Sequence, residues 1–214
     1  MCPQSGSTLT KAGSPILRMC NVSKTIRLAT LLPADLDLNG DQANLLVLQK
    51  RLEYRGVNAE ITELRDTLNL DFDLVFLGHG SMAAWAEIDK QNPDLASKLA
   101  EASANGTFVF AVNSGYLKLA AAMGIQSNVG NHRSEFVDVA GNVGYLNSNV
   151  DIDLLNYSQN SLLTMLHGPV LVKNPELADK IIEDRGWADI SIWNEKLERI
   201  SSLAKASREI AFEH

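Results

Sequence analysis

The sequence contains little cysteine, and none where it could staple a core. Cys2 and Cys20 both lie within the first twenty residues of a 214-residue chain. Two isolated cysteines form neither a disulfide framework nor the ligand pattern of a metal site, so we expect no metal and no cofactor. This usage fits a reducing compartment, and we expect a cytoplasmic protein.

Long apolar runs and clustered positive charge are also missing. No run reaches the about eighteen apolar residues of a membrane span, and the Ser/Gly/Thr/Pro-rich beginning lacks the apolar segment of a signal peptide. The net charge is −7, with 19 Lys and Arg against 26 Asp and Glu, and the cations are scattered. Without a basic stripe for phosphate backbones, nucleic acid is not an expected partner.

Hydrophobic residues make up 45% of the sequence, enough for one domain with a sizeable core. Residues 1–18 are rich in Gly, Ser and Pro and cannot bury enough apolar surface to offset the entropy of ordering, so we expect a flexible tail there. We expect the domain over residues 19–186. An amphipathic helix follows over 187–214, marked by Trp193, Leu197, Ile200 and Ala204.

Short apolar runs alternate with helical patterns along the domain, which is typical of an α/β sheet with crossover helices. Two runs, 74–77 and 108–112, are apolar without alternation, as expected of central strands covered on both faces. We therefore predict an α/β fold with a mostly parallel central sheet flanked by helices. The predicted strands are Ile26–Leu32, Val57–Leu64, Asp73–Gly78, Thr107–Val112, Glu135–Val139 and Leu162–Leu166. Helices are predicted before Gly56, before Gly106, and from Asn174 to Gly186.

Two loops follow the central strands, where ligands of parallel sheets usually bind. They read Gly78-His79-Gly80-Ser81 and Asn113-Ser114-Gly115-Tyr116. The second has the form of a nucleophile elbow, which holds side chain 113 above the sheet while the N–H groups of Ser114 and Gly115 face an oxyanion. Because glycine allows close backbone approach, Gly78, His79 and Gly80 would supply the second oxyanion donor.

A histidine ends another apolar run, at Leu166-His167-Gly168-Pro169. Facing the elbow, His167 would be a general base. Each feature alone also has a structural explanation. Glycine-rich loops are common turns, and a lone histidine beside an apolar run is more often a structural residue.

The order and spacing of several segments along the chain is more specific than any one of them. They are Gly40-Asp41-Gln42-Ala43-Asn44, Arg51-Leu52-Glu53-Tyr54-Arg55-Gly56, Asp73–Gly78, Ala111–Tyr116, and Leu166–Pro169 with Lys173-Asn174-Pro175. Together they resemble the cobyric acid synthase-like branch of the class I glutamine amidotransferases, and within it the glutaminase subunits of lipid II isoglutaminyl synthases. The resemblance covers about Ile26 to Gly186 and implies a glutamine amidotransferase-like domain.

The functional prediction depends on the site residues that differ from the family pattern. The family elbow reads approximately Ala-Ile-Cys-Gly-Gly-Tyr, so the resemblance places Asn113 where the nucleophilic cysteine stands. An amide cannot attack glutamine or carry a thioester, although asparagine tolerates the strained elbow backbone. The family's Gly-Gly-Gly loop has become Gly78-His79-Gly80, and a Phe-Glu-Asn-His stretch appears as Tyr145-Leu146-Asn147-Ser148. His167, the base, is retained.

Three functional interpretations follow from the resemblance. The first is a non-catalytic pseudoenzyme that forms a heterodimer with a Mur ligase-like subunit in peptidoglycan precursor amidation. The second is an active glutaminase supplying ammonia to lipid II isoglutaminyl synthase, either because position 113 has been altered or because Ser114 swings round to face His167. The third is binding of glutamine or a related small amide or carboxylate at His79, Asn113 and His167 without turnover. Whether the C-terminal helix packs on its own domain or on a partner stays open.

Overall fold

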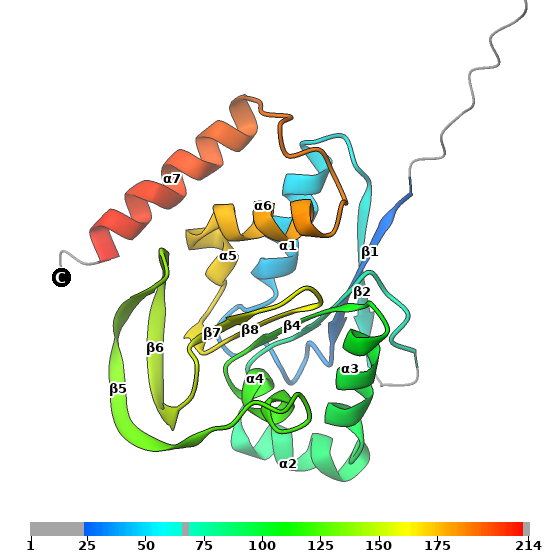
Figure 1. Cartoon of the computed structure of the whole chain (residues 1–214), viewed down its shortest axis with the longest axis vertical. Helices are drawn as coiled ribbons and strands as arrows, with labels where there is room; N and C mark the ends of the chain where they lie inside the picture. Colours follow the sequence, from blue (N-terminus) through cyan, green and yellow to red (C-terminus); the bar gives the residue numbers. More distant parts are fainter. Residues whose placement is uncertain (1–23, 66–68, 212–214) are drawn as a thin grey trace, which may run out of the picture.

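The computed structural model describes residues 24–65 and 69–211, and the expected tail at 1–18 lies outside the described residues. A six-stranded sheet with the order β2-β1-β3-β4-β8-β7 forms its centre (Figure 1). The strands are β1 (Ile26–Leu31), β2 (Ala59–Leu64), β3 (Leu74–Leu77), β4 (Phe108–Val112), β8 (Ser161–Thr164) and β7 (Leu155–Tyr157). Only the pairing of β7 with β8 is antiparallel, so the predicted α/β fold with a mostly parallel sheet is confirmed.

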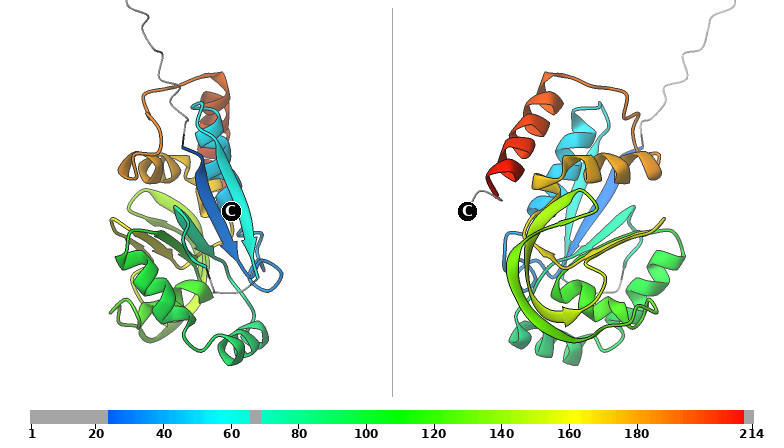
Figure 2. Two further views of the ribbon diagram at one scale, coloured as in Figure 1. Left: turned by 90° about the vertical axis from the view of Figure 1, so that its right-hand side faces the viewer. Right: turned by 60° about the vertical axis from the view of Figure 1, so that its left-hand side comes forward.

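Helices cover both faces of this sheet. They are α1 (Ala43–Glu53), α2 (Met82–Gln91), α3 (Leu95–Ala104), α4 (Ser114–Ala120), α5 (Val170–Lys173), α6 (Pro175–Asp184) and α7 (Glu195–Ala211). α1, α5 and α6 pack together on one side, and α2, α3 and α4 lie on the other (Figures 1 and 2). Every residue of β3 and β4 is buried, because these two strands lie between the two helical layers.

A second, antiparallel sheet stands beside the first. It consists of β5 (Asn128–Val139), β6 (Asn142–Asp151) and β9 (Leu166–His167). The predicted strand 135–139 therefore lies outside the main sheet, within the much longer β5. The predicted strand 162–166 is also divided, since β8 ends at Thr164 and the chain crosses to the second sheet at Leu166. The β5–β6 hairpin buries Val137 and Leu146 against the core and leaves its other face largely exposed.

A buried charge cluster fixes α1 to α6. Arg51 and Arg55, whose side chains are 1% and 0% exposed, both bind the carboxylate of Asp179. The Arg51 Nε and the Arg55 Nη2 lie 2.7 and 2.9 Å from Oδ1 of Asp179. The two arginines of the segment from Arg51 to Gly56 therefore have a structural role, which is to hold α1 against α6.

The C-terminal helix begins later than its apolar pattern predicts. The Asn194 side chain accepts hydrogen bonds from the N–H groups of Lys196 and Leu197, so it acts as an N-cap and Trp193 lies before the helix. Leu197 and Ala204 are buried, and α7 contacts α5 and α6 of its own domain. Among the described residues, no helix is both long and apolar enough to cross a membrane.

Candidate functional site

Asn113 occupies the sharp turn between β4 and α4. Its backbone angles, φ 48° and ψ −111°, lie in a region that non-glycine residues rarely adopt. The main chain holds this conformation from both sides, because the Asn113 N–H donates to the Thr164 carbonyl at 2.7 Å and the Asn113 carbonyl accepts from the Leu117 N–H at 3.0 Å. The local geometry is that of an elbow, and the side chain it presents is an amide that is only 6% exposed.

Glycine is required where the elbow meets the Gly78-His79-Gly80 loop. A Cβ at Gly115 would lie 2.8 Å from the carbonyl oxygens of Leu77 and Gly78, and a Cβ at Gly78 would lie 2.0 Å from the Leu36 carbonyl oxygen. Both contacts are too short for any side chain. The two loops and the segment between β1 and α1 are therefore in direct backbone contact at the carboxyl edge of the sheet.

His167 lies against Asn113 rather than across an open cleft from it. The amide nitrogen of Asn113 is 2.6 Å from the His167 Nε2, and the Asn147 carbonyl oxygen is 3.1 Å from the same ring nitrogen. On the other side of the ring, the Asn39 amide nitrogen is 2.9 Å from Nδ1. Three asparagine residues thus surround the imidazole.

The partners of His167 make opposing demands on its Nε2. The Asn147 carbonyl can only accept, which favours a hydrogen on Nε2, whereas the Asn113 amide nitrogen favours a lone pair there. The same amide nitrogen also lies 3.4 Å from the Met165 carbonyl oxygen, so the nitrogen of the amide, and not its oxygen, faces the ring. Nε2 is therefore already in contact with two neighbouring groups.

Ser114 points away from His167 and beneath the Gly78-His79-Gly80 loop. Its hydroxyl oxygen accepts from the Gly80 N–H at 2.9 Å and from the Trp85 indole N–H at 2.7 Å. The His79 Nδ1 is 2.8 Å away, and the Gly80 carbonyl oxygen is 3.2 Å away. Because both lone pairs of the hydroxyl are engaged, Ser114 is not presented as a nucleophile.

The Asp41 carboxylate binds the backbone of the loop around His79. It is completely buried, and one carboxylate oxygen, Oδ2, accepts the His79 N–H at 2.9 Å. The other, Oδ1, has no hydrogen-bond partner among the residues that the structure describes. Burial raises the pKa of the Asp41 carboxyl, against the lowering effect of the His79 N–H.

The two histidines of the site also lie close together. The rings of His79 and His167 meet edge to face, with centroids 5.2 Å apart. Burial, and secondarily the neighbouring His167, lowers the pKa of His79, so that this imidazole is neutral at neutral pH. A neutral His79 with the serine hydroxyl donating to its Nδ1 is consistent with the contacts of Ser114.

The structure brings all of the sequence-predicted residues into one cluster: Gly78, His79, Gly80, Asn113, Ser114, Gly115 and His167. Sequence reasoning assigned no role in the site to Asn39, Asp41, Trp85 or Asn147, which contact it. Asp41 and Asn147 did belong to segments singled out in the resemblance. Asn39 and Trp85 carried no signal, because their contacts depend on how the loops fold.

Two N–H groups of the loop around His79 already have acceptors within the protein. The His79 N–H is bonded to Asp41, and the Gly80 N–H is bonded to Ser114. Among the residues described, no group of three or more His, Cys, Asp or Glu could hold a metal ion.

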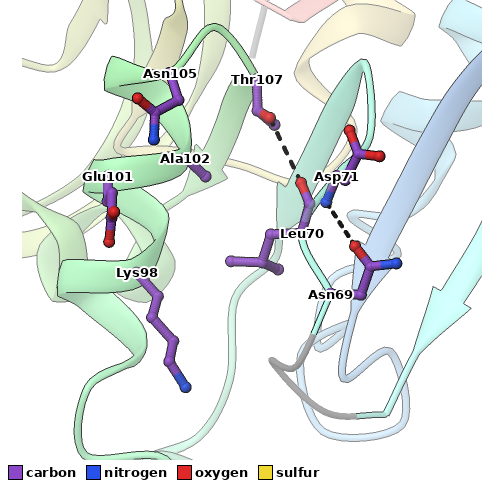
Figure 3. Close-up of a pocket in the computed structure, with 8 residues that line it drawn as sticks. All are labelled: Asn69, Leu70, Asp71, Lys98, Glu101, Ala102, Asn105 and Thr107. Atoms are coloured by element: carbon purple, nitrogen blue, oxygen red, sulfur yellow. Dashed lines mark hydrogen bonds between the residues drawn. The ribbon is translucent and has the colours of Figure 1, made fainter.

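Two cavities with mixed polar and apolar linings lie elsewhere on the sheet edges. One of about 650 Å³ is at the carboxyl end of β1 and β2, beside Pro33, Gln42 and Arg65. Another of about 460 Å³, shown in Figure 3, is lined by Asn69, Lys98, Glu101 and Thr107 among others. The second lies where β3 and β4 begin, the edge opposite to the one at which parallel sheets usually bind ligands.

Comparison with known proteins finds similarity to solved structures only. No protein-family model and no curated protein matches this chain. It is similar to a solved glutamine amidotransferase from Thermotoga maritima, with 12% identity, 87% of this chain and 93% of that chain covered, and a TM-score of 0.45. It is also similar to a second solved glutamine amidotransferase, with 16% identity, 74% of this chain and 98% of that chain covered, and a TM-score of 0.49. DJ-1β from Drosophila melanogaster shares 15% identity, with 84% of this chain and 97% of that chain covered, and a TM-score of 0.42. Such values are too low to transfer an activity, so the functional proposal rests on site geometry and sequence.

Proposed function

We propose that this chain is a glutamine amidotransferase-like domain that does not hydrolyse glutamine and is retained as a non-catalytic partner of another protein. The observation that carries the proposal is the side chain at the elbow. Asn113 keeps the strained backbone of a nucleophile but places an amide 2.6 Å from the His167 Nε2. An amide cannot form the covalent intermediate on which glutaminase chemistry of this type depends.

The surroundings of Asn113 support the same proposal. Ser114, the only neighbouring hydroxyl considered as a substitute nucleophile, is held by Gly80 and Trp85 on the far side of the elbow. To face His167 it would have to break both of these hydrogen bonds. A merely altered residue at position 113 does not account for the occupied loop N–H groups, which favours loss of function over an active glutaminase.

The partner that we propose comes from the sequence resemblance: a Mur ligase-like subunit, in a heterodimer that amidates peptidoglycan precursors. The segments that resemble the family help to build the sheet edge and fix α1 to α6 through buried structural contacts. Co-purification of the untagged protein from its native cells tests this. Recovery of a ligase subunit would support the proposal, and recovery of the chain alone from cells that contain such a ligase would contradict it.

Ammonia release from glutamine tests the loss of catalysis. We expect none above background, with calorimetric titration of glutamine on the same sample to separate the outcomes. Binding without ammonia would favour a ligand-sensing role for His79, Asn113 and His167. Turnover that persists in an Asn113→Ala variant would show that another nucleophile is at work and would refute the proposal.

A further inference from the structure

Strand β5 lies at the edge of the second sheet. Among the described residues, only β6 pairs with it, and in Figure 1 it forms the outer outline of the molecule. Of its twelve residues, only Val137 is buried. A long exposed edge strand presents a row of N–H and C=O groups that is a template for pairing with another chain.

The contacts of Asn174 show which backbone groups of β5 face outward. The Asn174 side chain binds both the N–H and the C=O of Val143, at 2.8 Å each, so these groups of β6 point away from β5. The Asn147 carbonyl, which binds the imidazole of the site, points the same way. Val143 pairs with Asp138 and Asn147 with Ser134, and hydrogen-bonded pairs alternate with such pairs along an antiparallel ladder. The N–H and C=O groups of Ser134 and Asp138 therefore point to the outer edge.

The stretch 133–139 lacks the features that usually protect an edge strand. It contains no proline and no lysine, and its pairing with β6 is regular, because the irregularity of β5 lies between Val129 and Arg133. Ser134 is exposed, and its hydroxyl lies 2.6 Å from the Tyr145 hydroxyl on β6. This short side chain therefore extends inward across the hairpin and leaves the outer edge accessible to another strand.

The charges on this stretch are complementary to themselves. Arg133 and Glu135 flank Ser134, both are exposed, and the Arg133 Nε lies 2.7 Å from the Glu135 Oε1. If two copies pair antiparallel with Ser134 opposite Ser134, Arg133 of each copy lies directly opposite Glu135 of the other. The four charges then alternate in sign along and across the strands. Moving the two-fold axis by one residue places Glu135 opposite Glu135, or Arg133 opposite Arg133, which is unfavourable.

We infer that this chain pairs with a second copy of itself along β5, with the two-fold axis at Ser134. Two N–H···O=C hydrogen bonds join the Ser134 residues of the two copies, and the two three-stranded sheets become one antiparallel sheet of six strands. Both copies use the same strand, so the contact is isologous and closes at a dimer. The inference does not depend on the proposed function, because it concerns a surface other than the elbow.

Sedimentation velocity over a concentration series tests the pairing through charge reversals. We expect the unchanged chain to approach twice its monomer mass as the concentration rises. Arg133→Glu and Glu135→Arg should each raise the dissociation constant by about tenfold or more, because each places two like-charged pairs across the interface. An equimolar mixture of the two variants should associate again, since an acidic edge then faces a basic one.

The matched controls are Arg199→Glu on α7 and Glu101→Arg on α3, which make the same charge changes at exposed positions outside β5. Circular dichroism checks that every variant is folded. Three results would each overturn the inference: an unchanged chain that stays monomeric throughout, a dissociation constant that the two reversals leave at the control value, or a mixture that stays dissociated.

A second measurement uses the unchanged chain alone. Where about nine-tenths of the chain is dimeric, amide hydrogen exchange of the Ser134 N–H should be about tenfold slower than in the monomer. The N–H groups of Glu135 and Val137, which face β6, should exchange at rates that do not depend on concentration. A Ser134 rate that does not change with concentration would overturn the inference, and full protection in the monomer would do so by assigning the edge to another segment of the same chain.

Discussion

Ser114→Ala is the most informative single change for stability, because it deletes one oxygen and leaves the backbone unchanged. That oxygen accepts hydrogen bonds from the Gly80 N–H and the Trp85 indole N–H. Trp85 is 4% exposed, and the indole N–H is the only polar group of its side chain. After the substitution, both donors remain in the interior without this acceptor.

The magnitude follows from the number of donors affected. A buried donor left without a partner costs about 1–3 kcal/mol. Two such donors give a loss on the order of 3 kcal/mol, allowing for partial rescue by an entering water. For a domain whose unfolding free energy is about 5–15 kcal/mol, this is a large fraction of the total.

Urea unfolding followed by tryptophan fluorescence and far-UV circular dichroism measures this difference. Ser97→Ala is the control, because the exposed Ser97 hydroxyl donates to the Asp94 carbonyl at the start of α3, and its loss should change stability by less than about 0.5 kcal/mol. A Ser114→Ala variant as stable as the control would refute the reasoning. It would mean that the convergent hydrogen bonds contribute nothing net to the fold.

Three further changes give distinct outcomes. Asp41→Asn should become progressively more stable than the unchanged protein as the pH rises, in urea midpoints measured across a pH series. The pKa of buried Asp41 is raised in the folded protein. The contribution of the protonated carboxyl to the free energy of unfolding is therefore full below the pKa of the unfolded state, and it is lost as the pH rises through the pKa of the folded state. Asp179→Asn should lose about 3–5 kcal/mol, because two buried guanidinium groups lose their counter-charge, and a loss below about 1 kcal/mol would contradict the burial. Asn113→Val should be less stable than Asn113→Gly by about 1–3 kcal/mol, because only glycine adopts φ 48° without strain, and equal unfolding midpoints would contradict the strained turn.

The sequence predicts well those parts of the fold that depend on local pattern. The uninterrupted apolar runs at 74–77 and 108–112 are typical of central strands, and both are completely buried. The turn at Asn113 was visible because a strand, a short polar turn and a helix follow one another without a gap. Each of these signals is contained within a few consecutive residues.

The β5–β6 hairpin lacked such a signal. Its turn is Ala140-Gly141, with both residues at positive φ, rather than the Asn-Gly or Asp-Gly that marks such turns in sequence. β5 is exposed over most of its length, so only the stretch around Val137 showed an apolar pattern. The hairpin matters for the site because the Asn147 carbonyl on β6 bonds His167.

The contacts that decide the chemistry were the least predictable from sequence. The sequence suggested the Ser114 N–H as an oxyanion donor and its hydroxyl only as a nucleophile facing His167, yet the hydroxyl bonds Gly80, Trp85 and His79 on the opposite side of the elbow. Which way a short side chain points at a helix start depends on the surrounding loops. No spacing in the sequence brings Asn39 to the His167 ring either, since 128 residues separate the two.

Most buried polar groups at the elbow are satisfied by hydrogen bonds within the protein, but one oxygen of Asp41 is not. The amide nitrogen of Asn113 and the hydroxyl of Ser114 have hydrogen-bond partners, as buried polar groups in stable interiors do. Asp41 does not follow this rule, because its Oδ1 is buried without a partner among the described residues and its pKa is raised. A neutral side chain of the same shape would keep the bond to the His79 N–H without the buried charge. The carboxylate is therefore the group whose presence packing alone does not explain.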